Sequence, residues 1–546
     1  MSVGDIKRIE LTKSSFVDII ANNCFYVDKT RMIESFLTSS NSVHLVARQR
    51  RLGKTLNMDT LRCFLTDKED LRHLFKGLYI EKSPLWAMAN SAPVFYFDFK
   101  GLRQDNYKKA IYGVVYEYIR DYCRNIELPW RVEEYLESKD FNNQDGLLYL
   151  TEAVYKATGK RSYLLIDEYD KLLMEVYNKE SYEEIRSFMT ALFSSALKSN
   201  QYLEKALLTG VMRISHESMF SGLNNIITYD VFNDDVYTSD YGFTEEEIEG
   251  ISKLADFDVS ELRQWYNGVR IFGTPIYNTY SVMSYLLRER YDCYWGKSGT
   301  MDIIRNLLDD SRLAVLAKLL MGEQAEVSIV DRVSLCQLAI EADDEAYYSL
   351  LVQAGYFALG EKVPGKFSMS YVSIPNTELM RVWKEFILSN LYPSSRKLRT
   401  LFDNIGNIEV FAEDMQYFLA DRLSQHDLEA KDEEGPRRRN EKLYHIFLLG
   451  LLSAYEDTGC RYPLSNRESG DGRYDILAER PKENVIFELK ACTNEEDLED
   501  AADKALGQIT GKRYGEDLDK SKRLIKVGIA FYMKKVRVKV AAEDGF

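Results

Sequence analysis

The sequence predicts an α/β protein: a core with a parallel sheet, a mainly helical middle region, and a second, smaller α/β unit at the C-terminal end. Over the first ~250 residues, short apolar runs alternate with helical stretches, which is the pattern of strands covered on both faces in a parallel sheet. From about Phe243 the pattern becomes helical. The last ~110 residues return to alternating strand and helix signals, so we expect a separate domain there.

Composition limits the class of protein. Hydrophobic residues make up 45% of the 546 residues and charged residues 29%, which is typical of a globular, water-soluble chain. The formal net charge of -15 argues against a protein that coats nucleic acid nonspecifically. From residue 437 onward, 21 Lys and Arg face 20 Asp and Glu, so the acidity lies in the preceding part. A local basic groove in the C-terminal unit is still compatible with this balance.

Membrane, export and disulfide signals are weak. No apolar run approaches the ~20 residues that span a bilayer, and the first residues contain no apolar signal core. Seven Cys are scattered along the chain without a C-x-x-C pair, which fits reduced thiols rather than a disulfide framework or a zinc ribbon. We therefore expect a cytoplasmic protein with no membrane partner.

The strands and helices of the first part can be placed from apolar spacing. A helix at 182–197 carries apolar residues at spacings of three and four. A helical stretch begins after Thr244, a plausible N-cap followed by three Glu. The runs predicted as strands are 43–47, 93–97, 163–166 and 206–208. We expect an N-terminal core at 1–242, a helical region at 243–400, a helix with a charged linker at 401–436, and a C-terminal domain at 437–546.

A phosphate-binding loop is predicted directly after the first strand. Residues 48–55 read Arg-Gln-Arg-Arg-Leu-Gly-Lys-Thr, and an amphipathic helix follows at 56–65. A P-loop needs this order, because the backbone N–H groups at the helix start point at the phosphates. Lys54 is predicted to reach the β- and γ-phosphates of ATP, and Thr55 to offer its hydroxyl to Mg²⁺. The general pattern has Gly where this chain has Arg48, so we expect a modified turn.

Two acids strengthen the nucleotide hypothesis. The run at 163–166 ends in Asp167 and Glu168. Asp167 is predicted to hold the Mg²⁺ water shell, and Glu168 to orient and deprotonate the attacking water. The alternative is that both acids cap the following helix.

Further residues are candidates for stabilising charge at the γ-phosphate. Thr209 ends the next strand and is predicted to contact the attacking water, while Arg213 is predicted to meet the γ-phosphate or, alternatively, to form an ion pair with a nearby acid. A role of Arg213 in a neighbouring subunit would require a homo-oligomer. The full predicted nucleotide-binding set is Arg50, Arg51, Leu52, Gly53, Lys54, Thr55, Asp167, Thr209 and Arg213.

The C-terminal unit carries a pattern of two acids and a lysine. Asp475 precedes Glu488 by thirteen residues across a turn that contains Pro481, so the two flanking strands can pair as a hairpin. Side chains alternate along a strand, which places Glu488 and Lys490 on one face. Two carboxylates beside a lysine suit Mg²⁺, with Mn²⁺ as an alternative, in the cleavage of a phosphodiester. A surface hairpin with a salt bridge is the alternative interpretation.

Neighbouring residues extend this hypothesis. Gln508, on the next predicted helix, is expected to contact the same water or a phosphate, and Glu441, on the preceding helix, to add a metal ligand. The intensely charged stretch at 429–439 is best interpreted as a solvated linker. A basic lip on a nucleic-acid groove is the alternative.

With these motifs, the whole chain resembles the AAA-ATPase-like family whose members end in a PD-(D/E)XK nuclease domain. In that family the loop reads R-P-R-R-F-G-K-[ST], and here Gln49 and Leu52 replace Pro and Phe. The resemblance therefore makes Arg48 a family-like residue. Other family-like segments are 26–30, 165–169, 220–225, 241–244, 265–268, 276–278, 444–445 and 472–475.

The resemblance implies a P-loop NTPase core, a helical middle region with a winged-helix part, and a restriction-endonuclease-like C-terminal domain. It implies an ATPase, with Lys54, Thr55, Asp167 and Glu168 matching one motif. The nuclease motif is matched by Asp475, Glu488 and Lys490.

These observations support two main hypotheses. The first is an ATP-dependent nuclease that acts on nucleic acid, most plausibly DNA, in defence or mobile-element control. The second is a nucleotide-switched binding or sensor protein whose nuclease-like unit binds nucleic acid or a partner without cutting. A scaffolding ATPase with a vestigial loop is a third option.

Overall fold

The computed structural model divides the chain into two compact units. One comprises Met1–Lys297 with Glu326–Glu378, and the other Ser298–Ala325 with Leu379–Phe546. The structure describes residues 8–11, 14–124, 126–213, 225–255, 257–295, 307, 310–320, 322–331, 343–391, 410–416, 444–445, 448, 461–465, 468–469, 472–480, 482–516, 518–533 and 535–543. No helix among these residues is long and apolar enough to cross a membrane.

The first unit is built on a five-stranded parallel sheet with the order β2-β3-β4-β1-β5. Strand β4 lies between β1 and β3. Because the three strands are parallel, their C-terminal ends lie at the same edge of the sheet. Buried aliphatic and aromatic side chains fill both faces, as the continuous apolar runs predict. The strands are β1 (Val43–Ala47), β2 (Val94–Asp98), β3 (Ser162–Asp167), β4 (Leu203–Gly210) and β5 (Ile226–Tyr229).

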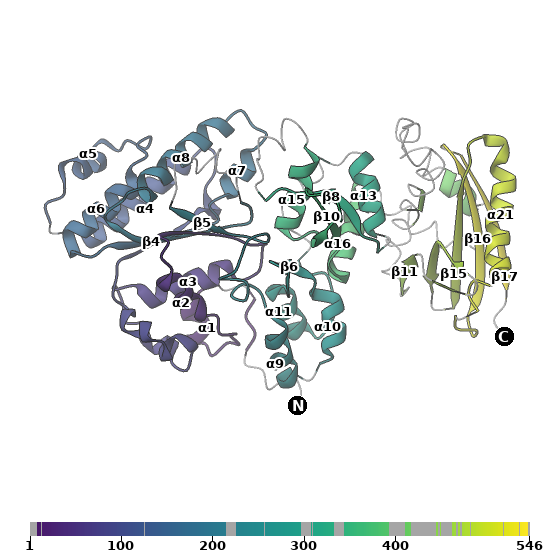
Figure 1. Ribbon diagram of the computed structural model, residues 1–546, viewed down its shortest axis with the longest axis horizontal. Helices are drawn as coiled ribbons and strands as arrows, with labels where there is room; N and C mark the ends of the chain where they lie inside the picture. Colours follow the sequence, from purple (N-terminus) through teal and green to yellow (C-terminus); the bar gives the residue numbers. More distant parts are fainter. Residues whose placement is uncertain are drawn as a thin grey trace. The chain divides into compact units, whose positions relative to one another are not determined.

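Helices cover both faces of this sheet (Figure 1). On one face lie α1 (Phe16–Ala21), α2 (Arg31–Thr38) and α3 (Lys54–Leu65). On the other lie α4 (Tyr107–Tyr122), α5 (Trp130–Ser138), α6 (Gly146–Thr158), α7 (Lys171–Val176) and α8 (Tyr182–Leu197). Short 3-10 helices span Arg72–Phe75, Tyr79–Lys82, Pro84–Met88 and Phe99–Gly101.

A mainly helical region follows the sheet. Its first helix begins with a capping box, since Thr244 accepts from the backbone of Glu247 at 3.3 Å and the Glu247 carboxylate accepts from the backbone of Thr244 at 2.9 Å. The helices are α9 (Glu245–Ala255), α10 (Val259–Tyr266), α11 (Thr279–Arg288), α13 (Asp310–Leu320), α15 (Asp344–Ala354) and α16 (Thr377–Leu391). A hairpin of β6 (Val269–Ile271) and β7 (Thr274–Ile276) and a sheet of β8 (Ala325–Ser328), β10 (Met369–Ser373) and β9 (Ala358–Lys362) accompany them.

The second unit contains a mixed five-stranded sheet with the order β11-β14-β15-β16-β17. Its strands are β11 (Arg461–Ser465), β14 (Ile476–Glu479), β15 (Glu483–Ala491), β16 (Arg523–Tyr532) and β17 (Lys535–Glu543), and a small ladder pairs β12 (Glu468–Ser469) with β13 (Gly472–Arg473). A 3-10 turn at Glu495–Asp497 leads into α21 (Leu498–Gly511). Only β15 and β16 are parallel, because α21 provides the crossover between them.

The two faces of this sheet bury different side chains. Phe487 and Leu489 of β15 belong to one buried cluster, together with Tyr444. Ile486, two positions from Glu488 and on the same side of β15, belongs to the cluster that includes Ile509 of α21. The face that carries Glu488 is therefore the face covered by α21, the helix that runs alongside this sheet in Figure 1.

Close packing of α21 on β16 depends on Gly528. A Cβ at this position would lie 2.5 Å from the backbone N of Leu506 and 2.6 Å from the backbone O of Ala502. We predict that Gly528→Ala lowers the free energy of unfolding by about 1–3 kcal/mol, because backbone must shift. Gly507→Ala, on the same helix with open space around its Cβ position, should instead stabilise by about 1 kcal/mol. Denaturation of both variants checks this, and equal effects would contradict it.

The fold class predicted from the sequence is confirmed, with a parallel-sheet core and a C-terminal α/β domain. The predicted strand at 43–47 and helix at 182–197 coincide with β1 and α8. The borders expected at 243, 401 and 437 and the winged-helix part stay predictions. The charged linker and most of the helix expected before the C-terminal sheet lie outside the described residues.

Candidate nucleotide and metal sites

The loop between β1 and α3 has the backbone of a phosphate-binding turn. Gly53, immediately before α3, has φ +85°, and Arg51 has φ +65°. Positive φ is available to Gly at little cost, which explains Gly directly before Lys54. The first backbone N–H groups of α3 therefore point into the loop. Free N–H groups at the start of a helix attract an anion.

The contacts of the Arg48 side chain explain why this position of the loop is Arg and not the Gly of the general P-loop pattern. Its guanidinium is fully buried and forms an ion pair with Asp234, and it also donates to the backbone O of Tyr229 at 3.1 Å. The Arg48 N–H donates to the backbone O of Gly210 at 2.9 Å. The side chain thus connects the end of β1 to the end of β5 and the segment after it, so Arg48 contributes to packing.

Lys54 is held inside the loop. Its ammonium donates to the backbone O atoms of Arg48 at 2.9 Å and Gln49 at 2.8 Å. Burial lowers the pKa of Lys54, and the nearby carboxylates of Asp167 and Glu168 oppose that shift. A positive group thus already lies at the helix start, where phosphate oxygens would replace two carbonyl partners.

Asp167 of β3 contacts predicted nucleotide-binding residues of α3 and β4. Its carboxylate accepts from the Thr55 hydroxyl at 2.6 Å and from the buried Thr209 hydroxyl. Tyr96 of β2 lies 3.5 Å from the same carboxylate, and its pKa is raised by burial and by Asp167. Because Thr55 and Asp167 lie 112 residues apart in the sequence, this contact is produced by the sheet order. A hydroxyl and a carboxylate at this spacing fit a Mg²⁺ with its water shell.

Glu168 follows Asp167 in the left-handed region, with φ +52°. Burial raises the pKa of Glu168, while the charge of Lys54 lowers it. A non-Gly residue at positive φ is uncommon and is often found at functional positions. A partly buried carboxylate with a raised pKa suits a general base.

Asp170, which the sequence reasoning did not assign, fixes the neighbouring strand end. Its buried carboxylate accepts from the backbone N–H groups of Val211 and Met212, both at 2.8 Å. This bond links the residues after β3 to those after β4. The sequence signal for it is an acid three positions after Asp167.

Arg213 adopts the alternative that the sequence left open. Its guanidinium lies 3.2 Å from Asp230 and 3.8 Å from Asp331, and its backbone N–H donates to Gln353 at 3.0 Å. Burial raises the pKa of Asp230, and Arg213 opposes that shift. The structure therefore does not bring Arg213 to the Asp167 cluster by a described contact.

The outer loop residues contact the helical region. Arg51 donates to the backbone O of Tyr294 at 2.8 Å and stacks 3.9 Å from the centre of the Tyr280 ring. The backbone O of Arg50 accepts from the indole N–H of Trp295 at 3.3 Å. Leu52 is buried in the core of the unit. Of the predicted set, Gly53, Lys54, Thr55, Asp167 and Thr209 lie together, with Glu168 beside them.

Glu378 is a further buried acid, and no sequence motif marks it. Its carboxylate accepts from the Ser281 hydroxyl at 2.8 Å and from the backbone N–H groups of Tyr294 and Trp295 at 2.6 and 2.7 Å. Burial raises its pKa to about 7, and the nearby charge of Arg51 lowers it. Glu378 therefore organises the segment that holds the outer loop.

A pH-dependent stability follows from this acid. Below the ordinary pKa of 4.5 the carboxyl is protonated in both folded and unfolded chains; as pH rises toward 7 the unfolded chain ionises first. Stability contributed by the protonated carboxyl is thus lost between pH 4.5 and about 7, by roughly 3 kcal/mol. We predict that Glu378→Gln flattens this slope in denaturation followed by Trp fluorescence. The exposed Glu361→Gln should keep the slope, and an unchanged slope in Glu378→Gln would contradict the assignment.

The second candidate site lies at the β14–β15 hairpin. Ile476 pairs with Phe487 in the antiparallel register, so Asp475, one residue earlier, lies opposite Glu488. The Asp475 carboxylate accepts from the backbone N–H of Leu489 at 2.7 Å. The hairpin expected from the sequence is confirmed, and it places both acids on the face covered by α21.

Glu488 is the centre of this group. It is 2% exposed, and one carboxylate oxygen accepts from Lys490 at 3.1 Å and from the Gln508 amide of α21. The other oxygen is buried and has no hydrogen-bond partner among the described residues. Burial and the neighbouring Asp475 raise the pKa of Glu488 to about 7, and Lys490 and Lys512 lower it. An orphaned carboxylate oxygen is an acceptor without a donor.

The donor set suits a divalent cation. Burial raises the pKa of Asp475, an effect opposed by its backbone hydrogen bond and by Lys490 and Lys512. Two neighbouring buried carboxyls with raised pKa values are both ionised most easily when a cation lies between them. Oxygen ligands of this kind suit Mg²⁺ or Mn²⁺.

Two other predictions on this site have different outcomes. Gln508 does reach Glu488, which the close approach at Gly528 allows. Glu441 lies outside the described residues. Lys512, whose charge acts on both acids, was missed, because it follows α21 and no spacing rule connects it to the hairpin. In the described part of the chain, no three or more His, Cys, Asp or Glu side chains are arranged so that they could hold a metal ion together.

The chain is similar in part to several known proteins. A curated relative, an uncharacterized protein in the vnfD 5' region of Azotobacter chroococcum mcd 1, is 27% identical over 405 residues, or 71% of each chain. A crystal structure of a Signal Transduction ATPase with Numerous Domains (STAND) protein from Pyrococcus horikoshii has a TM-score of 0.25 and 12% identity; 79% of this chain matches 57% of that one. The structure of Drosophila ORC bound to AT-rich DNA and Cdc6 has a TM-score of 0.15 and 11% identity, over 68% and 91% of the two chains.

Two family models match separate parts of the sequence. Residues 11–220 match a family described as predicted AAA-ATPase, and residues 439–541 match the PD-(D/E)XK nuclease superfamily. The first range contains the loop and Asp167, and the second contains the hairpin with Asp475 and Glu488. The chain therefore carries an AAA-ATPase-like part at residues 11–220 and, at residues 439–541, a part that matches the PD-(D/E)XK nuclease superfamily.

Proposed function

We propose that this protein binds and hydrolyses ATP and uses that cycle to control metal-dependent cleavage of nucleic acid by its C-terminal domain. The observation that carries the proposal is the orphaned, buried oxygen of Glu488 opposite Asp475, with Lys490 and Gln508 on the other oxygen. The contact between Thr55 and Asp167 supports the ATP part. We propose the cytoplasm as the place of action.

In the ATP step, Lys54 exchanges its two carbonyl partners for oxygens of the β- and γ-phosphates. Thr55 and Asp167 would hold Mg²⁺, which would supply charge neutralisation at the phosphates. Glu168, with its raised pKa, accepts the proton of the attacking water. Thr209 keeps Asp167 oriented through its hydroxyl.

The other residues of the predicted nucleotide-binding set have supporting roles. Arg50 and Arg51 bring positive charge to the mouth of the loop, and Leu52 and Gly53 shape its backbone. Arg213 would have to leave Asp230 to act on the γ-phosphate, so we assign it the weaker role.

In the cleavage step, Asp475 and Glu488 would hold Mg²⁺ or Mn²⁺, which would supply activation of a water and charge neutralisation at the phosphate. Lys490 orients the nucleophile or stabilises the charge that develops on phosphate oxygen. Gln508 positions Glu488 and the water. Glu441 is proposed as a further ligand. DNA is the substrate we expect.

Binding without cleavage is the second candidate function. The charge of Glu488 is partly compensated by Lys490, and the described residues offer two acids rather than three at this position. A site compensated in this way can bind a phosphate backbone through Lys490 and Lys512 without holding a metal. The chain would then act as a nucleotide-controlled sensor.

A cleavage assay with the full-length protein separates the two candidates. Linear DNA, circular DNA and RNA are each incubated with Mg²⁺ or Mn²⁺, with and without ATP. Our proposal expects cleavage that needs a divalent cation and changes with ATP. Binding in a gel-shift assay without cleavage under any of these conditions would favour the sensor. A plasmid-transformation or phage-plating assay in cells then tests a role in defence or mobile-element control.

A further inference from the structure

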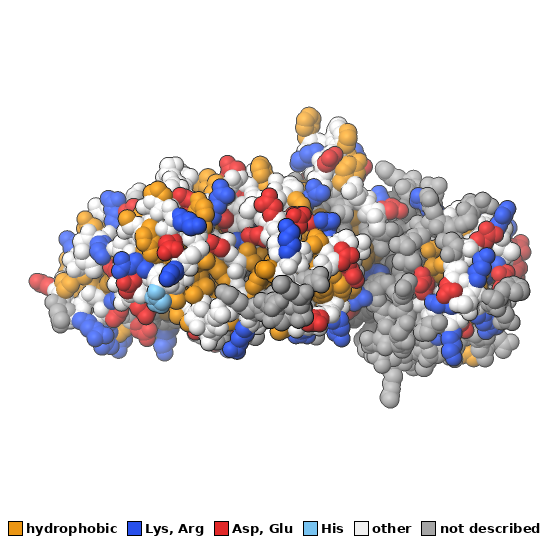
Figure 2. Space-filling view, turned by 90° about the horizontal axis from the view of Figure 1, so that it is seen from below, with side chains coloured by type: hydrophobic (Ala, Val, Ile, Leu, Met, Phe, Trp, Pro, Cys, Tyr) orange, Lys and Arg blue, Asp and Glu red, His pale blue; other side chains and the backbone are white. Residues whose placement is uncertain are grey.

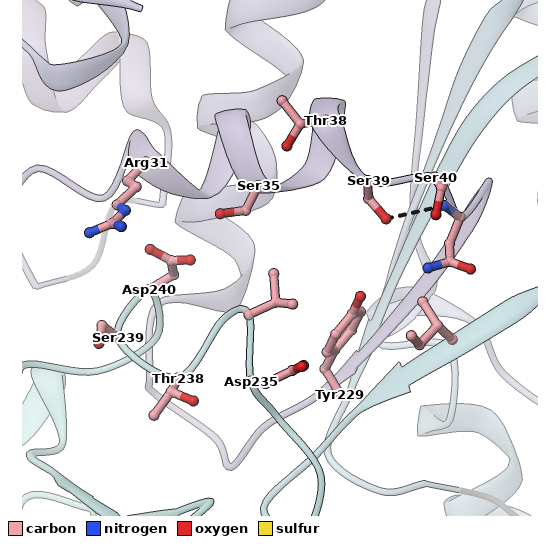
Figure 3. A pocket seen from close by; sticks show the side chains of 13 residues that line it. Arg31, Ser35, Thr38, Ser39, Ser40, Tyr229, Asp235, Thr238, Ser239 and Asp240 are labelled. Atoms are coloured by element: carbon pink, nitrogen blue, oxygen red, sulfur yellow. Dashed lines mark hydrogen bonds between the residues drawn. The ribbon is translucent and has the colours of Figure 1, made fainter.

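A polar groove lies on the first unit, beside the start of β1 and β5 (Figure 3). Its volume is about 710 Å³. The phosphate-binding loop follows the opposite end of β1, so the groove is separate from the nucleotide residues. Seven hydroxyl side chains line it, from α2, the turn after α2, β5 and the segment 235–240. Its charged lining residues are Arg31, Asp235 and Asp240.

Asp240 is the feature of this groove that points to a ligand. The residue is 6% exposed, and its carboxylate forms no hydrogen bond or ion pair with any residue that the structure describes. Figure 3 shows that carboxylate directed toward Arg31 and Ser35. Burial raises the pKa of Asp240 to about 7, and Lys29 and Arg31 oppose that shift. A buried carboxylate without donors is costly, so a ligand that supplies donors gains what the free protein lacks.

The lining selects the class of ligand. Hydroxyl groups both donate and accept hydrogen bonds, carboxylates accept from adjacent hydroxyls, and Arg31 donates. Two acids against one Arg disfavour a phosphate or another anion. An apolar ligand would find only Ile227 and Val236 as apolar lining side chains and would leave polar groups unsatisfied.

We propose that this groove is an effector site for a small polyhydroxylated molecule, a sugar or a nucleoside, whose adjacent hydroxyls bind Asp240. Such a ligand has the donors that Asp240 needs and the acceptors that Arg31 and the serine hydroxyls need. On the face shown in Figure 2, basic and acidic side chains are interspersed over the described residues.

The wall of the groove also holds the phosphate-binding loop. The backbone O of Asp240 accepts from the side chain of Asn57 in α3 at 2.7 Å. Asp234, next to the lining residue Asp235, forms the buried ion pair with Arg48. Two residues after Asp240, the Gly242 N–H donates to the backbone O of Leu52 at 3.0 Å. Ligand binding that repositions segment 235–240 therefore changes the loop, and this coupling rests on the ATP binding proposed above.

Ligand-observed NMR titrations of the full-length protein test the site. The probes are D-ribose and D-glucose for sugars, uridine for nucleosides, and 2-deoxy-D-ribose, which lacks one of the adjacent hydroxyls. We expect at least one probe to bind, with affinity reduced at least tenfold by Asp240→Asn and abolished by Ser35→Leu, which fills the groove without changing charge. The exposed Asp105→Asn should bind as the wild type does. A ribose signal that exceeds the 2-deoxyribose signal supports recognition of adjacent hydroxyls.

Coupling is measured by titrating ATP with and without the bound probe. We expect at least a threefold change in the Kd for ATP, and an equal change in probe affinity when ATP is saturating. Absence of binding by all four probes, or binding that neither variant reduces, would overturn the site. Probe binding that leaves a measurable Kd for ATP unchanged would overturn the effector role. Failure to bind ATP at all would instead refute the proposed function, because probe binding is read separately.

Discussion

Glu488→Gln is expected to reduce metal-dependent cleavage by about 10³-fold or more. The amide of Gln can still accept from Lys490 and Gln508 through its oxygen, as one oxygen of Glu488 does. The NH₂ group replaces the orphaned oxygen and cannot bind a cation. The substitution therefore removes a metal ligand while it preserves the contacts to α21. Rates on linear DNA across a Mg²⁺ and Mn²⁺ series measure the effect.

A matched control makes this result specific. Glu496→Gln changes the same chemical group at an exposed position before α21, so it should cleave at the wild-type rate. Circular dichroism and melting of Glu488→Gln should match the wild type or show a slight gain, because a buried acid with a raised pKa is neutralised. Cleavage by Glu488→Gln at the wild-type rate would place the active site elsewhere.

Local patterns predicted the framework well. The continuous apolar run at 43–47 is a strand buried along its whole length, and the spacing of three and four at 182–197 is a helix. Two strands were not predicted from the sequence. β5 has only four residues, and β17 alternates basic and apolar residues on one edge of its sheet, which is how edge strands avoid pairing with other chains.

Motif spacing predicted the residues of the candidate sites better than it predicted the residues that hold those sites in place. Thr55, Asp167 and Thr209 meet because the sheet order brings their strand ends to one edge. The roles of Arg48 and Glu378 depend instead on partners far along the chain: Asp234, 186 residues from Arg48, and the backbone at 294–295, more than 80 residues from Glu378. Such contacts have no local sequence signal, since they arise from tertiary packing.

Lys54→Ala is expected to weaken ATP binding by roughly 10- to 100-fold, because a hydrogen bond from a charged donor contributes about 1.5–3 kcal/mol. Stability should change little: the ammonium is buried with a lowered pKa, so its removal relieves a desolvation cost that offsets the loss of two bonds to loop carbonyls. Isothermal titration with Mg²⁺ and ATP measures the affinity, and the exposed Lys109→Ala is the control for loss of one positive charge. Equal ATP affinity in Lys54→Ala and wild type would mean that the loop is vestigial. In that case the hydrogen bond between Thr55 and Asp167 would serve only the structure, and the chain would be a scaffold rather than an ATPase.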